Sequence, residues 1–296
     1  MPKFHLFAIL FFSVLCYTPV AFAQSGSVTA PYTNGEVRAL ANYGDTVLVG
    51  GNFTKVFSYE QSSERIAYFD TLNGQHIAAK LITNGDIKKI IRDENGTGFY
   101  IAGTFTTVGD SVRSGVAHID AAGNVTARLR AWRMETPNYN DLVLRGDSLF
   151  AAGSFLNNIY PANSAASGYL KGISTLTGTN DNSNLPEVNG PIDYMVTDAM
   201  GARYICGSFT RVGNQPRNMV AKIDSLGNVL PWEPNITGAA VVTMMLRGNR
   251  IILAGRFEFV NGQTRNSIAE VDTASGKSTT ALNIVANRGG LLCSIH

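Results

Sequence analysis

The chain has 296 residues, of which 45% are hydrophobic and 16% are charged, and its formal net charge is +2. This apolar content is enough for a large folded core and excludes a mainly disordered chain. The nearly balanced charge lacks the basic footprint of a nucleic-acid-binding protein, so we expect no nucleic-acid partner.

The first residues have the three parts of a secretory signal peptide, which we assign to residues 1–23. Lys3 supplies the positive charge, residues 6–15 (LFAILFFSVL) the apolar stretch, and residues 21–23 (AFA) the cleavage site. The apolar stretch is short for a membrane span. We therefore expect cleavage after Ala23, a protein that is secreted, periplasmic or on the cell surface, and no transmembrane segment in residues 24–296.

A repeat of about 50 residues fills the rest of the chain, which is typical of a repeat architecture. In each unit a glycine is followed two residues later by a phenylalanine, which we expect to pack between neighbouring units. These pairs are Gly51/Phe53, Gly103/Phe105, Gly153/Phe155, Gly207/Phe209 and Gly255/Phe257. The units span residues 35–84, 85–138, 139–190, 191–238 and 239–290, and residues 291–296 (LLCSIH) resemble the first strand of a partial sixth unit.

Each unit begins with two predicted strands joined by a tight polar turn. The first strand is largely apolar or alternating, as in 87–92 (IKKIIR) and 241–247 (VVTMMLR). The second is a continuous apolar run ending at the repeated glycine, which is typical of a strand covered on both faces. We expect that glycine to mark a β-bulge or a close approach of two backbones.

A third strand carries the pattern R-x-x-[IVM]-A-x-[IVF]-D, and a weaker fourth strand leads out through an Asn-rich loop. Asn34-Gly35, Asn84-Gly85 and Asn189-Gly190 take matching places before the next first strand. The recurring Asp70, Asp120, Asp224 and Asp272 are expected to form turns, with Arg65, Arg113, Arg217 and Arg265 as partners or carbonyl ligands.

Four strands per unit and no convincing helix predict an all-β fold, a β-propeller of about five four-stranded blades. A stacked β-solenoid is the structural alternative. The five units and the partial sixth also fit an incomplete ring of six or more blades.

The pattern G-x-F-t-x-v followed by R-N-x-[IV]-A-x-[IV]-D-x-x-G-x-[VL]-x-P-W-x-P-N resembles delta-60-type repeats, which are grouped as a β-propeller domain of unknown function. The best match is residues 203–238, and the resemblance covers about residues 28–296. The third unit departs most, with an insertion, no matching Arg, and Ser174 in place of the Asp. The resemblance implies a secreted or surface-exposed bacterial protein and supplies no catalytic residues.

No catalytic, metal or cofactor motif stands out. His76, His118 and His296 lie in different units, and Cys206 and Cys293, the cysteines left after cleavage, are expected to stay unpaired. Arg128, Arg130, Trp132 and Arg133 are interpreted as a solvated loop plus a repeated aromatic. We therefore assign no catalytic residue, no metal ligand and no cofactor.

Ligand contacts are expected in the third unit, because it loses the scaffold residues and gains aromatic and amide side chains in its loops. Drift in a tolerant loop is the competing explanation. The candidate residues are Asn157, Asn158, Tyr160, Tyr169, Asn180, Asp181, Asn182 and Asn184.

The function that these features favour is a secreted or cell-surface, non-enzymatic binding or scaffold module whose partner is an extracellular protein or a glycan. The alternative is an extracellular carbohydrate-active enzyme or sugar-binding propeller with a central site. An enzyme would bring carboxylates together from the first strands, which offer Glu36, Asp86, Asp141 and Asp193.

Overall fold

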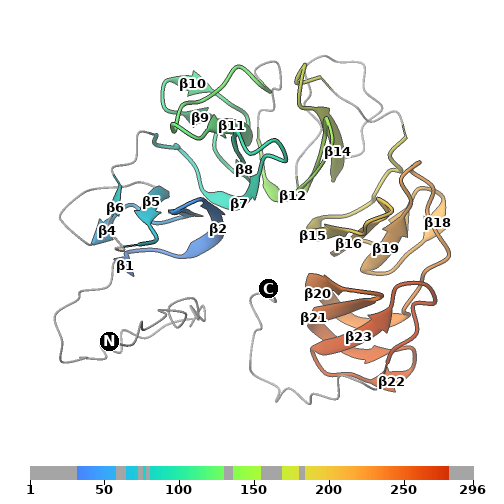
Figure 1. Cartoon of the computed structure of the whole chain (residues 1–296). Coiled ribbons are helices and arrows are strands. Elements are labelled where there is room, and N and C mark those ends of the chain that lie inside the picture. The colour runs from blue at the N-terminus through green and yellow to red at the C-terminus, as the bar shows by residue number, and fades with distance from the viewer. Residues whose placement is uncertain are drawn as a thin grey trace, which may run out of the picture.

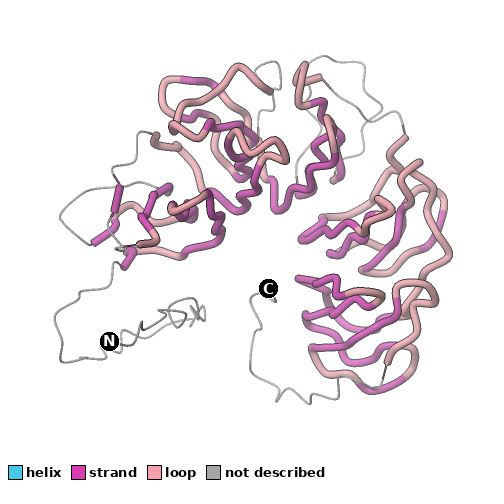
Figure 2. Tube along the Cα trace, viewed as in Figure 1, coloured by secondary structure: helices cyan, strands magenta, loops and turns pink. Residues whose placement is uncertain are grey.

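The computed structural model describes residues 32–57, 65–72, 76–77, 81–129, 136–154, 169–179 and 184–279. Within these ranges every regular element is a β-strand, and Figure 2 shows strand and loop only. No helix of the described chain has the length and apolarity of a membrane span. The predicted signal peptide and the partial sixth unit lie outside the described residues.

Five antiparallel sheets of three or four strands, which we call blades 1–5, follow one another around a common centre (Figure 1). Blade 1 contains β2 (Val37–Tyr43), β3 (Thr46–Gly51), β5 (Ile66–Asp70) and β6 (His76–Ile77). Blade 2 contains β7 (Ile87–Arg92), β8 (Gly98–Gly103) and β11 (Val116–Asp120), and blade 3 contains β12 (Tyr139–Arg145), β13 (Ser148–Gly153) and β14 (Leu170–Ser174). Blade 4 contains β15 (Ile192–Thr197), β16 (Arg203–Gly207) and β19 (Val220–Ile223). Blade 5 contains β20 (Ile236–Arg247), β21 (Arg250–Val260), β22 (Gln263–Thr264) and β23 (Ile268–Asp272).

The first strand of each blade, β2, β7, β12, β15 or β20, faces the common centre (Figure 1). The second strand pairs with the first on one side and with the third on the other. This arrangement confirms the predicted all-β propeller architecture and the first three strands of each unit.

The predicted fourth strand is shorter than the sequence suggested in blade 4, where the described residues have only the isolated bridge Ile223–Val229. Blade 1 has the two-residue β6, and blades 2 and 5 have the isolated bridges Ile119–Val125 and Val271–Ser278. The predicted segments of these three blades lie partly outside the described residues. In blade 4 the physical reason is the sequence 231–234 (PWEP), since neither proline has an N–H to continue a ladder. Trp232 turns inward instead, where its indole donates to the Asp272 carbonyl at 2.9 Å.

Short outer hairpins were not predicted. They are β9 (Thr107–Val108) with β10 (Ser111–Val112), β17 (Arg211–Val212) with β18 (Gln215–Pro216), and the end of β21 with β22. Their turns, Gly109-Asp110, Gly213-Asn214 and Asn261-Gly262, are dipeptides that favour tight hairpins. That signal was present in the sequence.

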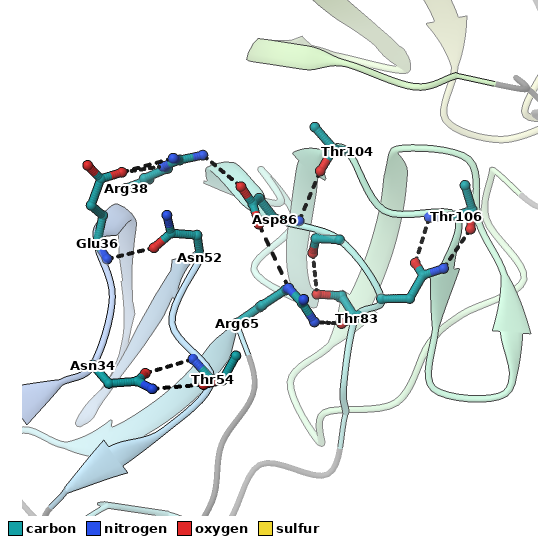
Figure 3. A network of polar contacts seen from close by, with 12 residues as sticks. Asn34, Glu36, Arg38, Asn52, Thr54, Arg65, Thr83, Asp86, Thr104 and Thr106 are labelled. Carbon is teal, nitrogen blue, oxygen red and sulfur yellow. Dashed lines mark hydrogen bonds and ion pairs between the residues drawn. The ribbon is translucent and has the colours of Figure 1, made fainter.

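In blades 1, 2 and 4 the matching Asn-Gly pairs tie the chain before the first strand to the loop that follows the second strand, as Figure 3 shows for blades 1 and 2. The Asn34 side chain donates to Thr54 Oγ1 at 2.8 Å and accepts from the backbone N–H of Thr54 at 2.8 Å. Asn84 and Asn189 make the same contacts with Thr106 and Thr210. These asparagines are therefore scaffold residues, as their recurrence indicated.

The repeated glycine confirms the expected close approach in all five blades. A Cβ on Gly51, Gly103, Gly153, Gly207 or Gly255 would lie only 1.8–2.3 Å from a carbonyl oxygen near the start of the first strand. At the same place the first strand has a register shift, so that one residue has no partner on the second strand. Only glycine allows this contact, and the contact accompanies the bulge.

The apolar core lies mainly between neighbouring blades. Phe105 packs in a cluster with Leu48 and Ile66 of blade 1, and Phe209 packs in a cluster with Leu170 of blade 3. Phe105, Phe209 and Phe257 are buried in clusters that join neighbouring blades, which confirms their predicted packing role. Phe53 is buried in a cluster of the first unit alone, and Phe155 lies outside the described residues. Further clusters join blades 2 and 3 and blades 4 and 5.

Gly103→Ala should lower the free energy of unfolding by about 1–3 kcal/mol, the usual cost of overpacking a rigid site. The new methyl would lie 1.8 Å from the Asp86 carbonyl oxygen, so backbone must move. Denaturant unfolding would measure the loss. Gly248→Asn is the control, because Gly248 lies in an open turn with nothing within 4 Å and Asn tolerates its positive φ. Equal stability of Gly103→Ala and wild type would contradict the proposed contact.

Candidate functional site

The bulge on each first strand presents one unpaired residue at the inner edge of its blade. These residues are Arg38, Lys88, Asn140, Asp193 and Val242. Four of them are polar: Arg38, Lys88, Asn140 and Asp193. We call these four, together with Glu36, Asp86 and Asn138 just before the bulges, the axial belt. The same backbone feature thus places different side chains at equivalent positions around the centre.

Between blades 1 and 2 the axial belt is an ion-pair network (Figure 3). Arg38 bonds Glu36 Oε2 through Nη2 at 2.8 Å and Asp86 Oδ2 through Nη1 at 2.9 Å. Arg65 reaches toward the same carboxylate, with Nε 3.8 Å from Asp86 Oδ1, and donates to the Thr83 carbonyl at 2.9 Å. Both carboxylates of this half of the belt are therefore held by guanidinium groups.

Between blades 2, 3 and 4 the belt continues through amides. Lys88 Nζ donates to Asn138 Oδ1 at 2.6 Å and to Asn140 Oδ1 at 2.9 Å. The Asn140 amide then donates to the Ile192 carbonyl at 2.9 Å. Burial lowers the pKa of the Lys88 ammonium, and Arg38 adds to this effect while Asp86 and Asp193 oppose it.

Asp193 differs from the other belt carboxylates. It is half-buried, and burial raises its pKa, whereas the nearby charges of Lys88 and Arg256 act in the opposite direction. Lys88 and Arg256 therefore act on the Asp193 carboxylate at a distance and form no direct ion pair with it in the described structure.

A second polar layer lies one residue further along the same strands and is more deeply buried. Asp141 has no exposed surface and forms an ion pair with Lys89, with 2.7 Å between Oδ1 and Nζ. Its other oxygen accepts from the backbone N–H of Met195 at 2.7 Å, and Lys89 also lies over the Tyr194 ring, 4.6 Å from the centroid. Burial raises the pKa of the Asp141 carboxyl, although Lys89 counteracts this effect. This layer links blades 2, 3 and 4.

The four carboxylates proposed for an enzyme therefore do lie on or beside the first strands, but the structure does not gather them into one acid–base set. Glu36 and Asp86 are paired with Arg38, and Asp141 is buried against Lys89. Of these four carboxylates, Asp193 alone is partly exposed and forms no ion pair with another described residue. The sequence located these residues but could not show which cation each one meets.

The recurring aspartates are scaffold residues, as predicted. Asp224 Oδ1 accepts from the backbone N–H groups of Leu226 at 2.9 Å and Asn228 at 2.8 Å, and Asp70, Asp120 and Asp272 accept equivalent bonds in their own turns. Local hydrogen bonds lower the pKa of Asp120, Asp224 and Asp272.

Arg65 is a carbonyl ligand, as predicted, but it does not occupy the same position as the recurring arginines of the other units. Arg113 and Arg217 are buried and donate to the carbonyls of Thr126 and Leu230, which confirms the carbonyl-ligand role. Arg65 instead occupies the positive-φ position directly before the third strand, which Met219 and others occupy elsewhere. Arg65 therefore lies two residues closer to its third strand than Arg113 and Arg217 do. The longer loop of the first unit obscured this difference when the units were aligned.

Of the eight candidate ligand residues in the third unit, the structure describes two. Tyr169 is half-buried, packs against the core between blades 3 and 4, and accepts from the Gly153 N–H through its carbonyl at 3.1 Å. Asn184 is exposed. Asn157, Asn158, Tyr160, Asn180, Asp181 and Asn182 lie outside the described residues, so these ligand contacts stay a prediction.

The third unit also differs from the others at Lys171, which the sequence analysis did not identify. It is 1% exposed and occupies the place of Ala67, Ala117, Ala221 and Ala269 in the other units. Among the described residues its Nζ has no hydrogen-bond partner, and burial lowers its pKa to about 8. A charged residue at a repeated alanine position is a signal that an alignment of the units would have revealed.

A further polar cluster in blade 2 was also missed. The buried His118 contacts Asp93 Oδ2 at 3.2 Å and Thr126 Oγ1 at 3.0 Å through its two ring nitrogens. Arg128 binds the same Asp93 oxygen at 2.9 Å and the Tyr100 hydroxyl at 2.9 Å, so its predicted solvated role is wrong. Arg130, Trp132 and Arg133 lie outside the described residues.

A separate cleft of about 480 Å³ lies beside the contact between blades 1 and 2, lined by Arg65, Ile82, Thr83, Asn84, Thr107, Gly109 and Asp110. Arg65 and Thr83 are engaged with each other and Asn84 with the adjoining loop. The axial belt carries more chemistry than this cleft and is our candidate site.

Comparisons with known proteins agree with the architecture. Residues 249–276 match the model of a β-propeller domain of unknown function, DUF5122. No curated protein sequence matches the chain. A similar solved structure is the extracellular domain of a protein described as a hybrid two component system, BT3049, from B. thetaiotaomicron, with a TM-score of 0.50, 13% identity, and coverage of 85% of this chain and 29% of that one.

Two other solved structures are similar at lower scores. The designed Ika8 protein has a TM-score of 0.48 and 10% identity, with 82% of this chain and 60% of that chain covered. The nidogen/laminin complex has a TM-score of 0.47 and 12% identity, with 82% and 78% covered. The chain thus spans less than two thirds of the length of Ika8 and of the BT3049 domain.

Lys89→Met should destabilise the protein by about 3–5 kcal/mol, because it leaves the buried Asp141 charge uncompensated. Urea unfolding at pH 7 would measure this. The double variant Lys89→Met/Asp141→Asn should recover part of the loss, because a neutral amide removes the unpaired charge. If the single variant were as stable as wild type, Lys89 would not be the counter-charge of Asp141.

Lys171→Met should stabilise the protein by about 1–3 kcal/mol at pH 6, because it removes a buried, unpartnered ammonium. The pKa of Lys171 in the folded protein is about 8, below its usual value of 10.5. As pH rises, Lys171 therefore loses its proton in the folded state before it does so in the unfolded state. The free-energy cost of burying its charge is complete below about pH 8 and decreases as pH approaches the unfolded pKa of 10.5. Chemical unfolding at pH 6 and pH 10 would show a stabilisation that shrinks at pH 10, and a pH-independent difference would argue against this origin.

Proposed function

We propose that this chain is a secreted or cell-surface, non-enzymatic β-propeller that acts as a binding or scaffold module, and that the axial belt contacts its polar extracellular ligand. The signal-peptide pattern of residues 1–23 supports export. The rigid blades support a binding role, because they hold polar side chains in fixed places around the centre.

The observation that most favours a non-enzymatic function is that Glu36 and Asp86 of the belt are paired with arginine. General acid–base catalysis needs a carboxyl group that is free to gain and lose a proton during the reaction. Arg38 forms ion pairs with both Glu36 and Asp86, and Asp141 has no exposed surface with which to meet a substrate. Paired groups of this kind are suited to holding a ligand in one orientation.

The chemistry of the belt favours a ligand rich in hydroxyl or amide groups. Its members offer guanidinium and ammonium donors beside carboxylate and amide acceptors, as in the Lys88–Asn138–Asn140 contacts. Such mixed donors and acceptors match the hydroxyl groups of a glycan or the backbone of a peptide. The partner is therefore an extracellular glycan or protein. The third-unit loops, with Tyr160, Asn180 and Asn184 among their candidates, form a second proposed contact region.

Asp193 favours the alternative, an extracellular carbohydrate-active propeller. Burial raises its pKa, which is a property of a general acid, and its surface remains partly accessible. Canonical glycoside hydrolysis requires a second carboxylate at a suitable separation. Among the described belt residues the other carboxylates are neutralised by arginine.

Binding and hydrolysis can be separated in one experiment. The exported protein would be screened against an array of extracellular glycans and peptides, and every hit would be tested for cleavage. Lys88→Met and Asp193→Asn should each weaken a specific hit by about tenfold or more, the effect of losing a charged hydrogen-bonding group. Lys277→Met, at an exposed position of blade 5, is the control and should bind normally.

Unchanged binding by both belt variants would remove the axial belt as the site. Cleavage of a bound glycan that Asp193→Asn abolishes would replace the proposed function with the enzymatic alternative.

A further inference from the structure

The described part of the chain contains four Asn-x-Thr sequences, the acceptor pattern for N-linked glycans in exported proteins. Their asparagines are Asn52, Asn95, Asn124 and Asn235, and none of the middle residues is proline. The pattern is short and recurs by chance, so the folded surroundings of each asparagine decide whether it can carry a glycan. A suitable amide must be accessible and must not be needed by the fold.

Three of these asparagines use their side-chain amides within the fold. Asn52 is half-buried, and its Oδ1 accepts from the Glu36 backbone N–H at 2.6 Å (Figure 3). Asn124 Nδ2 lies 3.3 and 3.2 Å from the two carboxylate oxygens of Asp120. Asn235 Nδ2 donates to a carbonyl of its own loop at 3.3 Å, and its backbone is left-handed with φ 46°. A glycan on any of the three would compete with a contact that shapes the loop.

Asn95 differs because its side chain is exposed and forms no hydrogen bond with another described residue. It lies in the turn between β7 and β8, where only its backbone is used: its N–H donates to Asp93 Oδ1 at 3.2 Å. The Thr97 hydroxyl donates to Asp93 Oδ2 at 2.6 Å, and the Gly96 N–H donates to the Asp93 carbonyl at 2.9 Å. The turn is therefore closed without the Asn95 amide, which is left accessible.

We propose that Asn95 carries an N-linked glycan in the exported protein. The donor is an oligosaccharide attached to a polyprenyl diphosphate, and a transferase on the side to which the chain is exported catalyses the reaction. Asn95 Nδ2 forms a bond to the anomeric carbon of the sugar while the bond from that carbon to the diphosphate oxygen breaks. The diphosphate leaves with the electron pair, and one amide proton passes to a base of the transferase. The turn loses no contact, because it uses neither atom of the amide.

The glycan lies on the face of the propeller opposite the axial belt. Lys88 is near the start of β7, whereas the turn with Asn95 follows the end of this strand at Arg92. A strand rises roughly 3.3 Å per residue, so about 13 Å of β7 separates Lys88 from Arg92 before the turn begins. The belt stays open to its ligand. This inference therefore shares only the export step with the proposed function.

The test is tryptic peptide mapping of the protein purified from its native source. Cleavage after Arg92 and Arg113 gives the peptide 93–113, in which Asn95 is the only asparagine. Tandem mass spectrometry should locate a glycan on Asn95 and find unmodified asparagine in the three peptides that contain the other Asn-x-Thr sequences. The same map identifies the mature N-terminus, so that export is measured in the same sample.

Two matched pairs of variants identify the acceptor. Asn95→Gln should lose the glycan completely, whereas Asn235→Gln should keep it. Thr97→Ser retains the hydroxyl of the acceptor pattern and should keep the glycan, whereas Thr97→Val should lose it. Thr97 also bonds Asp93, so Asn95→Gln supplies a loss that leaves the hydrogen bonds of the turn intact.

An exported protein with an unmodified Asn95 would overturn this inference and leave the proposed function standing. A protein that is retained in the cell with residues 1–23 attached would overturn both. A sugar on peptide 93–113 that persists in Asn95→Gln would place it on a hydroxyl group and would also overturn the assignment. Glycans on Asn52 or Asn124 in the folded protein would contradict the selection by side-chain contacts.

Discussion

The contact on which this structure depends is a glycine Cα held against a carbonyl oxygen at the inner edge of each blade. Any side chain at Gly51, Gly103, Gly153, Gly207 or Gly255 would collide with backbone. Because the second strand approaches so closely, the first strand accommodates one extra residue, and that residue is the one at the centre. The axial belt therefore follows from a backbone requirement, and its chemistry is free to vary from blade to blade.

The interfaces between blades combine two kinds of interaction with different consequences. Apolar clusters such as that around Phe105 stabilise each interface without specifying much beyond volume and shape. The Lys89–Asp141 pair instead adds a directional requirement, since both groups must meet inside the fold. Buried pairs of this kind contribute little net stability and penalise any arrangement in which one partner is missing. They therefore fix how blades 2, 3 and 4 are placed relative to one another.

Much of the fold could be predicted because the same local pattern occurs in each unit. The continuous apolar runs that end at glycine predicted the second strands and the close approach of the backbones, and the recurring Asp predicted the turns. The fourth strand of blade 4 was overestimated because Pro231 and Pro234 interrupt the segment. The cations around Asp86 and Asp141 could not be predicted, since Arg38 and Lys89 come from neighbouring blades and sequence spacing carries no record of that contact. Lys171 was missed although the alanines at its equivalent positions marked it.

The order of the blades also affects how the chain can fold while it is being synthesised. Within the described residues the apolar clusters join only blades that are consecutive in the sequence, so each interface can form as soon as two adjacent units are available. In repeat architectures of this type stability is built from neighbour to neighbour. A chain that is synthesised from its N-terminus can thus add blades in the order in which they emerge, and each new blade can pack on the surface of the blade before it. Folding would then proceed in one direction along the chain, and no early unit would have to wait for a distant partner.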